Sequence, residues 1–289
     1  MICELCPRRC GVPRTESEGS GFCRMPGQVH IARAGLHHWE EPVISGTKGS
    51  GAVFFSGCTL RCSFCQNRDI SAGGFGKPVT TARLRQIFRE LIAQGAHNIN
   101  LVTPDHFTPW ILEALDEEWG VPVVWNCSGY ARVDTLRTLE GKVQIYLPDL
   151  KYADSTLAQQ LSGAADYFEY ATAAIEEMYR QVGGAVIRDG LLQKGVVIRH
   201  LMLPGQLNNT KQCIDWVSRT FPKGDVLFSL MSQYTPQPDA EGFLARRVRR
   251  SEYRAAVEYM ELCGIEGGFT QELDSAQAEY TPDFDLTGV

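Results

Sequence analysis

The sequence predicts an α/β protein with a largely parallel sheet, preceded by a cysteine-rich segment. Residues 1–50 are rich in Cys, Gly, Pro and Arg and show weak periodicity. From residue 51 onward, six apolar runs of strand length alternate with longer helical patterns. Strands that alternate with helices pair in parallel through right-handed crossovers. This order of elements fits an open doubly wound sheet as well as a closed or partly closed barrel.

The predicted elements follow one another as strand and then helix. Thr80 or Thr81 can cap the first long helix, which Gly95 ends. The predicted strands are residues 52–55, 99–102, 121–125, 143–147, 195–203 and 226–231. The predicted helices are residues 80–94, 109–119, 134–140, much of 155–182, 211–221 and 252–263. No G-x-G-x-x-G follows the first strand, so the sequence lacks the fingerprint of a dinucleotide-binding fold.

The composition of the 289 residues limits the classes of function. Hydrophobic residues make up 44% and charged residues 21%, which excludes a disordered or collagen-like chain. The net charge of −6 argues against sequence-independent binding of nucleic acid. No apolar run approaches the ~18 residues that span a bilayer, and the first residues contain no apolar stretch of signal-peptide length. We therefore expect a cytoplasmic protein that binds neither nucleic acid nor membrane.

Seven of the ten cysteines fall into two groups. A chain of this size can bury a core without disulfides, so clustered cysteines indicate metal ligands rather than bridges. The first group lies within the first 23 residues and consists of Cys3, Cys6, Cys10 and Cys23. The second group follows the first predicted strand and consists of Cys58, Cys62 and Cys65.

The three-cysteine loop predicts an iron–sulfur cluster. A structural zinc site needs four ligands, and this loop contains no fourth Cys or His. A 4Fe–4S cluster normally binds four thiolates, so three leave one iron open to a substrate or cofactor. The alternative is a set of three buried structural cysteines.

The spacing Cys58-x3-Cys62-x2-Cys65, with Phe64 before the last cysteine, resembles the signature of the radical S-adenosylmethionine (SAM) superfamily. The resemblance implies a partial (β/α)6 barrel and a 4Fe–4S cluster whose open iron is chelated by the amino and carboxylate groups of SAM. It also implies that an electron from the reduced cluster cleaves SAM, and that the resulting 5′-deoxyadenosyl radical abstracts a hydrogen atom. A flavodoxin- or ferredoxin-like protein would supply the electron.

Two further stretches resemble the pyruvate formate-lyase activating enzymes. Residues 65–69, Cys-Gln-Asn-Arg-Asp, are close to their Cys-His-Asn-Arg-Asp, and residues 149–151, Asp-Leu-Lys, match a strand end that contacts SAM. This branch implies hydrogen abstraction from a protein or peptide backbone. A radical enzyme acting on a small molecule or a protein side chain is the alternative, followed by a non-catalytic iron–sulfur or zinc module.

The sequence departs from the activating enzymes after the second predicted strand. Those enzymes carry Gly-Gly-Glu there, which holds the SAM amino group, whereas this chain has Thr103-Pro104-Asp105-His106. Asp105 can accept hydrogen bonds from an ammonium in its place. The residues expected to bind SAM are Phe64, Asn67, Thr103, Asp105, Asn126, Asp149 and Lys151.

The N-terminal group of four cysteines predicts a second metal site. Four thiolates complete a coordination shell, which fits structural zinc as well as a second iron–sulfur cluster. Spacing does not choose between the two. We expect residues 1–50 to form a metal-binding region and residues 51–289 to form the barrel with its C-terminal helix.

Other polar residues at the predicted strand ends have two interpretations each. His106 and His200 handle substrate or are structural. Gln233 and Tyr234 contact adenine or substrate, although Tyr234 is more typical of a core aromatic with a polar tip. Cys127 is a radical-relay thiol or, by its type, a small buried residue. Residues 246–250, Arg-Arg-Val-Arg-Arg, form a solvated face or dock an acidic electron donor.

Overall fold

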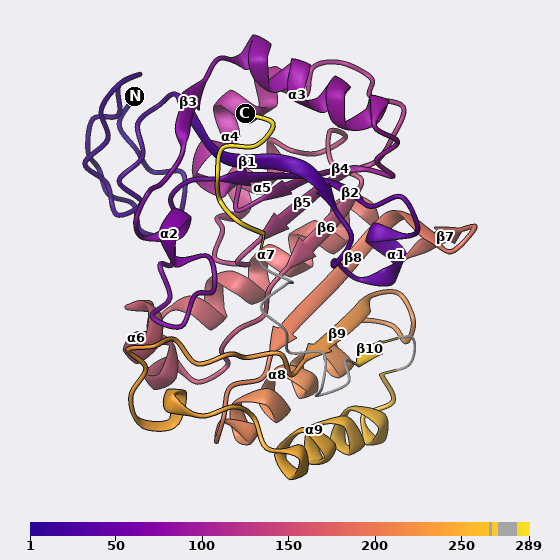
Figure 1. The fold of residues 1–289 in the computed structure, drawn as a ribbon. Helices are drawn as coiled ribbons and strands as arrows, with labels where there is room; N and C mark the ends of the chain where they lie inside the picture. The colour runs from indigo at the N-terminus through magenta and orange to yellow at the C-terminus, as the bar shows by residue number, and fades with distance from the viewer. Residues whose placement is uncertain (266–267, 271–281) are drawn as a thin grey trace.

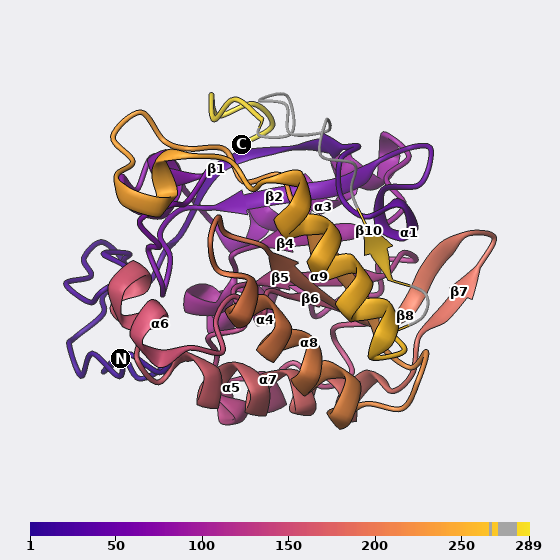
Figure 2. The same cartoon turned by 90° about the horizontal axis from the view of Figure 1, so that it is seen from below.

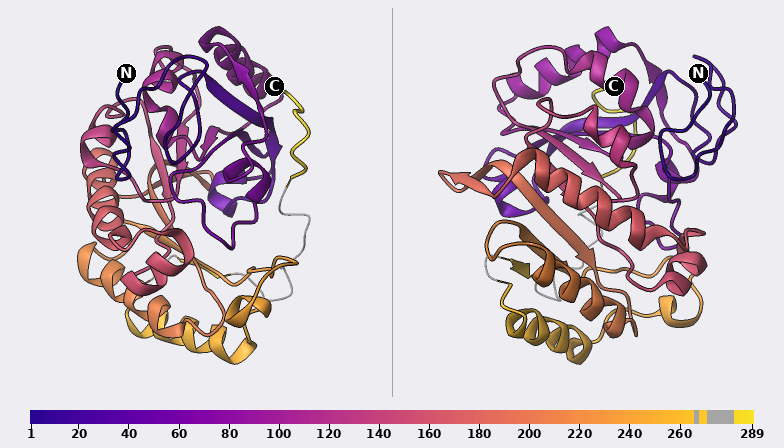
Figure 3. Two further views of the ribbon diagram at one scale, coloured as in Figure 1. Left: turned by 90° about the vertical axis from the view of Figure 1, so that its left-hand side faces the viewer. Right: turned by 180° about the vertical axis from the view of Figure 1, so that it is seen from behind.

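A computed structural model describes residues 1–265, 268–270 and 282–289. Its centre is one curved sheet in the order β10-β9-β8-β6-β5-β4-β2-β1-β3, with helices on its convex outer face (Figures 1 and 3). The strands are β1 (Val29–His37), β2 (Ser50–Phe55), β3 (Lys77–Val79), β4 (Ile99–Val102), β5 (Val123–Cys127), β6 (Ile145–Pro148), β7 (Val186–Arg188), β8 (Leu191–Leu201), β9 (Leu227–Met231) and β10 (Phe269–Thr270).

The six predicted strands form most of the parallel part of this sheet, and β10 extends it beside β9. β2, β4, β5, β6, β8 and β9 pair in that order, each parallel to the next. β2 and β9 do not pair with each other, so the sheet stays open. The predicted α/β fold is confirmed as an open, largely parallel sheet, which is a partial barrel.

The remaining four strands escaped the sequence analysis. β1 pairs antiparallel with β2 and β3, and its sequence lies in the segment of weak periodicity. β7 pairs antiparallel with β8, and β10 extends the other edge of the sheet beside β9. These strands are short or contain polar residues on both faces, so their apolar pattern is too weak to read.

Helices follow the parallel strands and cover the outer face (Figure 2). They are α3 (Thr81–Ala93), α4 (Thr108–Ala114), α5 (Val133–Arg137), α6 (Ser155–Ser162), α7 (Tyr167–Val182), α8 (Leu207–Thr220) and α9 (Arg250–Leu262), with short α1 (Pro42–Ser45) and α2 (Arg68–Ser71). The 3₁₀ turns are η1 (Asp105–Phe107) and η2 (Gly242–Ala245). Thr80 caps α3 by accepting a hydrogen bond from the Arg83 N–H, as predicted.

The predicted helical stretch 155–182 consists of two helices. α6 ends at Gly163, whose φ of 58° lies in the left-handed region that favours glycine. The chain then turns and begins α7 at Tyr167. Because of this break, the last carbonyl groups of α6 accept hydrogen bonds from other segments of the chain.

Helix α1 closes the barrel at the amino-terminal ends of its strands. Its Ile44 is fully buried against a small apolar cluster inside the sheet. The other buried members of this cluster are Val124, Ile145, Leu147, Leu192, Val197 and Leu227. The opposite, carboxyl ends of the strands stay available for a site, which is where ligands bind in such folds.

The final described segment crosses the antiparallel edge of the sheet (Figure 1). The Leu286 N–H donates to the Ala32 carbonyl over 3.0 Å, and Phe284 packs edge-on against Phe54. Within the described ranges, no helix combines the length and apolar character needed to span a bilayer.

Truncating Ile44 tests the closing role of α1. Ile44→Ala leaves a cavity among fully buried side chains and should lower the free energy of unfolding by about 2–5 kcal/mol. Urea unfolding of the anaerobic protein, followed by circular dichroism, measures this loss. Val43→Ala, at a half-buried neighbour, should cost clearly less, and an equal loss for both variants would contradict the account.

Candidate active site

The three-cysteine loop begins where β2 ends. Gly57 has a φ of 81°, and a Cβ there would lie 2.3 Å from Met25 Cγ and 3.0 Å from the Cys23 carbonyl oxygen. Only glycine fits this turn without displacing the N-terminal segment. The turn directs Cys58 and the following residues across the carboxyl end of the sheet.

Each sulfur of the loop accepts one hydrogen bond. Cys58 Sγ accepts from the Leu60 N–H at 3.4 Å, Cys62 Sγ from the Ser162 hydroxyl at 3.1 Å, and Cys65 Sγ from the Ser71 hydroxyl at 3.3 Å. Burial, with Cys62 beside it, raises the pKa of the Cys58 thiol to about 12. Cys58 is buried and Cys62 and Cys65 are half-buried, and an iron–sulfur cluster supplies the positive charge that stabilises thiolates there. The donor set therefore fits the cluster.

A cavity of about 220 Å³ lies between this loop and the strand ends. Most of the predicted residues line it, from five segments of the chain. Those residues are Cys58, Cys62, Phe64, Cys65, Asn67, Thr103, Asn126, Cys127, Asp149, Lys151 and Gln233. The structure thus brings these residues from separate strand ends together around one cavity.

Thr103 shapes the cavity through its backbone. Its φ of 61° is rare for a β-branched residue, and its N–H donates to the Asn126 carbonyl over 2.8 Å. The chain thus turns sharply at the end of β4 rather than continuing as a strand. Strain of this kind is found at functional sites and is held in place by the surrounding structure.

Asp149 is the centre of a buried charge network at the cavity wall. Its carboxylate lies 2.6 Å from Lys151 Nζ and 3.0 Å from Arg199 Nε. Burial alone would raise the pKa of Asp149, but Lys151 and Arg199 outweigh burial and hold it below the usual value. Asp149 is therefore ionised and fixed in position, and it faces the space beside the cysteines.

Arg199 is the site residue that sequence reasoning missed. It lines the cavity, and its guanidinium also donates to Asn126 Oδ1 at 2.6 Å and to Glu40 Oε2 at 3.1 Å. Glu40 in turn accepts from the Asn126 amide at 3.1 Å. The available signal was a single charged residue inside an otherwise apolar strand run, since such a residue needs a buried partner.

Asp105 does not line the cavity. It lies in η1, is 4% exposed, and its Oδ1 accepts from the Trp125 indole N–H over 3.0 Å. Its Oδ2 has no hydrogen-bond partner, and burial raises the pKa of this carboxyl to about 6. The structure thus places Asp105 against the Trp125 indole and outside the cavity lining.

The two strand-end histidines are buried in the framework. His106 Nε2 lies 2.7 Å from the Ser56 carbonyl oxygen, and His200 lies 2.6 Å from the Leu150 carbonyl oxygen and 3.0 Å from Thr210. Burial lowers the pKa of His106 to about 3 and that of His200 to about 4. Both rings are neutral at physiological pH and lie outside the cavity lining, as expected for the structural interpretation.

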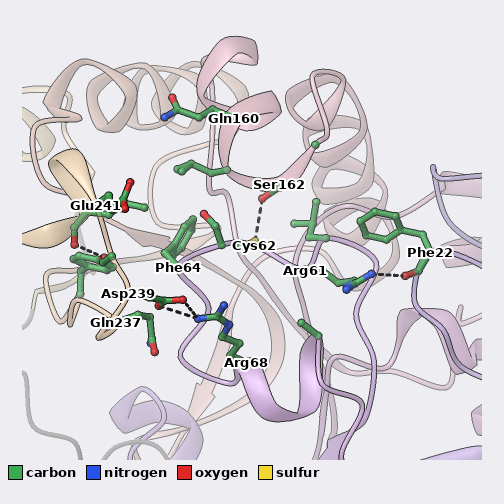
Figure 4. A pocket seen from close by; sticks show the side chains of 18 residues that line it. Phe22, Arg61, Cys62, Phe64, Arg68, Gln160, Ser162, Gln237, Asp239 and Glu241 are labelled. Atoms are coloured by element: carbon green, nitrogen blue, oxygen red, sulfur yellow. Dashed lines mark hydrogen bonds and ion pairs between the residues drawn. The ribbon is translucent and has the colours of Figure 1, made fainter.

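A second pocket of about 680 Å³ lies on the outer side of the cysteine loop (Figure 4). Cys62 and Phe64 border both this pocket and the inner cavity. Tyr234 lies here, and its hydroxyl donates to the Leu244 carbonyl at 2.7 Å. Arg68 and Asp239 form an ion pair of 2.7 Å across the opening. The loop therefore separates an inner cavity from an outer one.

The four N-terminal cysteines lie near one another. Burial, together with the neighbouring thiols of Cys23, Cys10 and Cys3, raises the pKa of Cys6 to about 12. The Phe22 N–H donates to Cys10 Sγ at 3.2 Å. Within the described residues, no three His, Cys, Asp or Glu side chains converge tightly enough to hold a single metal ion.

The fold and the cysteine loop define a class of protein that uses an iron–sulfur centre at the mouth of an open barrel. Residues 52–217 match the model of the radical SAM superfamily. The match covers more than half of the chain, and this protein belongs to the radical SAM superfamily.

Among the proteins similar to this chain are one relative and two solved structures. The relative is the uncharacterized protein MJ0674 of Methanocaldococcus jannaschii, 31% identical over 90% of this chain and 74% of its own length. Streptococcus suis SuiB bound to the precursor peptide SuiA gives a TM-score of 0.50 at 14% identity over 76% of this chain. Methylornithine synthase (PylB) gives 0.51 at 15% over 74% of this chain. This chain spans 48% and 61% of those two structures, which share its fold.

Substitution of two aspartates tests which of them faces the cofactor. Asp149→Asn removes a charged acceptor at the cavity wall and should weaken SAM binding tenfold or more. Asp105→Asn keeps the oxygen that accepts from Trp125 and should change SAM affinity by less than about twofold. Equilibrium binding to the anaerobic, cluster-loaded protein measures both, with iron content and circular dichroism as checks of folding. A larger loss of SAM affinity in Asp105→Asn than in Asp149→Asn would show that Asp105 contacts SAM instead.

Proposed function

We propose that this chain reductively cleaves SAM at a 4Fe–4S cluster bound by Cys58, Cys62 and Cys65. The observation that carries the proposal is the shared cavity. The three cysteines line the same cavity as the Asp149–Lys151 pair and Asn126. A cluster with three protein ligands would leave one iron without a protein ligand, and these polar residues would be available to the molecule that binds it.

The residues around the cavity have complementary roles toward SAM. A cluster with bound SAM supplies radical chemistry, in which one electron cleaves the sulfonium and a 5′-deoxyadenosyl radical abstracts hydrogen. Lys151 presents an ammonium to the SAM carboxylate, and Asp149 accepts hydrogen bonds from its amine or ribose. Thr103, Asn126, Phe64 and Asn67 complete the expected contacts.

The apolar part of the cavity lining protects the reaction from water. Phe55, Val102, Leu201 and Met231 line it beside the polar residues. Exclusion of water prevents quenching of a reactive intermediate and strengthens electrostatic contacts inside the site. The chain thereby orients the cofactor and limits side reactions, which is the usual contribution of a protein to cofactor chemistry.

We further propose that the hydrogen atom comes from a protein or peptide. The stretch 65–69 supports this substrate class, because it resembles the glycyl-radical activating enzymes. A second support is SuiB, which shares the fold and has been crystallised with a precursor peptide. A flavodoxin- or ferredoxin-like protein is the proposed electron donor.

The N-terminal cysteines are proposed to hold a second metal centre. Cys3, Cys6, Cys10 and Cys23 supply four thiols, and their mutual influence on the pKa of Cys6 supports a common site. Zinc and a second iron–sulfur cluster both suit four thiolates. Metal analysis of the protein purified without oxygen distinguishes them.

The product of SAM cleavage tests the proposed function. The anaerobically reconstituted protein, reduced with dithionite and given SAM, should form 5′-deoxyadenosine, measured by liquid chromatography. The variant with Cys58, Cys62 and Cys65 replaced by Ala should form none, because the three ligands are absent.

If no 5′-deoxyadenosine forms, a SAM binding titration distinguishes between two explanations. Protein that carries the cluster and binds SAM without cleaving it requires its substrate before cleavage. Protein that carries the cluster and does not bind SAM contradicts the proposal.

A further inference from the structure

Arg8 connects the N-terminal cysteines to the active-site loop. It lies between Cys6 and Cys10, two expected ligands of the N-terminal metal. Its Nε donates to the Thr59 carbonyl oxygen over 2.9 Å, and Thr59 directly follows Cys58. One side chain thus extends from the N-terminal metal-binding region to the backbone of the active-site loop.

The other end of the same guanidinium binds helix α6. Arg8 Nη2 donates to the Ser162 carbonyl oxygen over 2.6 Å, and Nη1 donates to the Gly163 carbonyl. These carbonyls belong to the end of the helix, where they lack partners within it and carry partial negative charge. A cation is therefore favoured at this point, and Arg8 caps α6 from outside.

The end of α6 contacts the active-site loop as well. The Ser162 hydroxyl donates to Cys62 Sγ at 3.1 Å, and the Ser63 N–H donates to the Leu161 carbonyl over 2.9 Å. Figure 4 shows Ser162 directed at Cys62 beside the outer pocket. Ser162 also shares a hydrogen bond of 2.7 Å with the Tyr152 hydroxyl. Arg8 therefore holds the end of α6, and Ser162 at that end donates the hydrogen bond to Cys62 Sγ.

Aromatic contacts hold Arg8 in this position. Its guanidinium lies 3.9 Å from the centre of the Phe22 ring and 5.3 Å from that of Tyr130. Phe22 precedes Cys23, the fourth N-terminal cysteine, and its carbonyl accepts from Arg61 Nη1 at 3.3 Å (Figure 4). Phe22, the N-terminal aromatic residue that positions Arg8, is therefore adjacent in sequence to an expected metal ligand.

We propose that Arg8 and Ser162 raise the reduction potential of the active-site cluster through the hydrogen bond to Cys62. The inference rests on the proposed function, since it requires a cluster at Cys58, Cys62 and Cys65. Hydrogen bonds to cluster sulfurs stabilise the more negative, reduced form and so raise the potential. Arg8 holds the end of α6 and, with it, the Ser162 hydroxyl against Cys62.

Redox titration of the active-site cluster tests this path. The reduced cluster is followed by electron paramagnetic resonance, and it is identified as the signal that changes when SAM is added. Ser162→Ala should reduce the ratio of reduced to oxidised cluster at a fixed potential roughly fivefold, the effect of one typical hydrogen bond. Arg8→Ala should lower the ratio in the same direction.

Two comparisons make the test specific. The double variant Arg8→Ala/Ser162→Ala should fall short of the sum of the two single effects, because both act through one hydrogen bond. Arg9→Ala is the matched control: Arg9 is an exposed neighbour between the same two cysteines, and it should leave the ratio unchanged. Additive effects, or an effect of Arg9→Ala equal to that of Arg8→Ala, overturn the path.

An unchanged ratio in both Arg8→Ala and Ser162→Ala overturns the inference and leaves the proposed function intact. A wild-type protein without a SAM-sensitive cluster contradicts both.

Discussion

The active site depends on a buried chain of opposite charges from Lys151 through Asp149 and Arg199 to Glu40. It links the ends of β6 and β8 to the segment that precedes α1, and all four side chains are largely removed from water. Loss of one partner from such a chain leaves an uncompensated buried charge, which costs about 3–5 kcal/mol. The carboxylate of Asp149 and the ammonium of Lys151 are therefore held in one arrangement at the cavity that the cysteines also line.

The parallel sheet and the cysteine loop could be predicted from the sequence because both are local signals. Apolar runs located β2, β4, β5, β6, β8 and β9, and the spacing of Cys58, Cys62 and Cys65 located the cluster site. Arg199 and Glu40 could not be found this way, since their meaning comes from a pairing across 159 residues. Asp105 was expected at the cavity because it follows β4, but the positive φ of Thr103 turns the chain and directs its carboxylate to Trp125.

The N-terminal segment contributes more than a separate metal-binding region. Arg14 is buried and donates to the carbonyls of Met25, Pro26 and His106, and Arg8 binds the active-site loop and α6. The planar guanidinium group of arginine suits such clusters because it donates hydrogen bonds to several carbonyl oxygens in a fixed geometry. The two cysteine groups are thus parts of one structure, joined by side chains that lie next to the expected ligands.

The most direct test of the account is whether SAM binds the open iron at the three-cysteine loop. Electron–nuclear double resonance on the reduced protein, with SAM labelled with ¹⁵N in the amino group and ¹⁷O in the carboxylate, measures this contact. The account predicts resolved coupling of both nuclei to the cluster, and loss of coupling in Asp149→Asn as binding weakens. A fully loaded cluster with SAM bound and no coupling from either nucleus would contradict it.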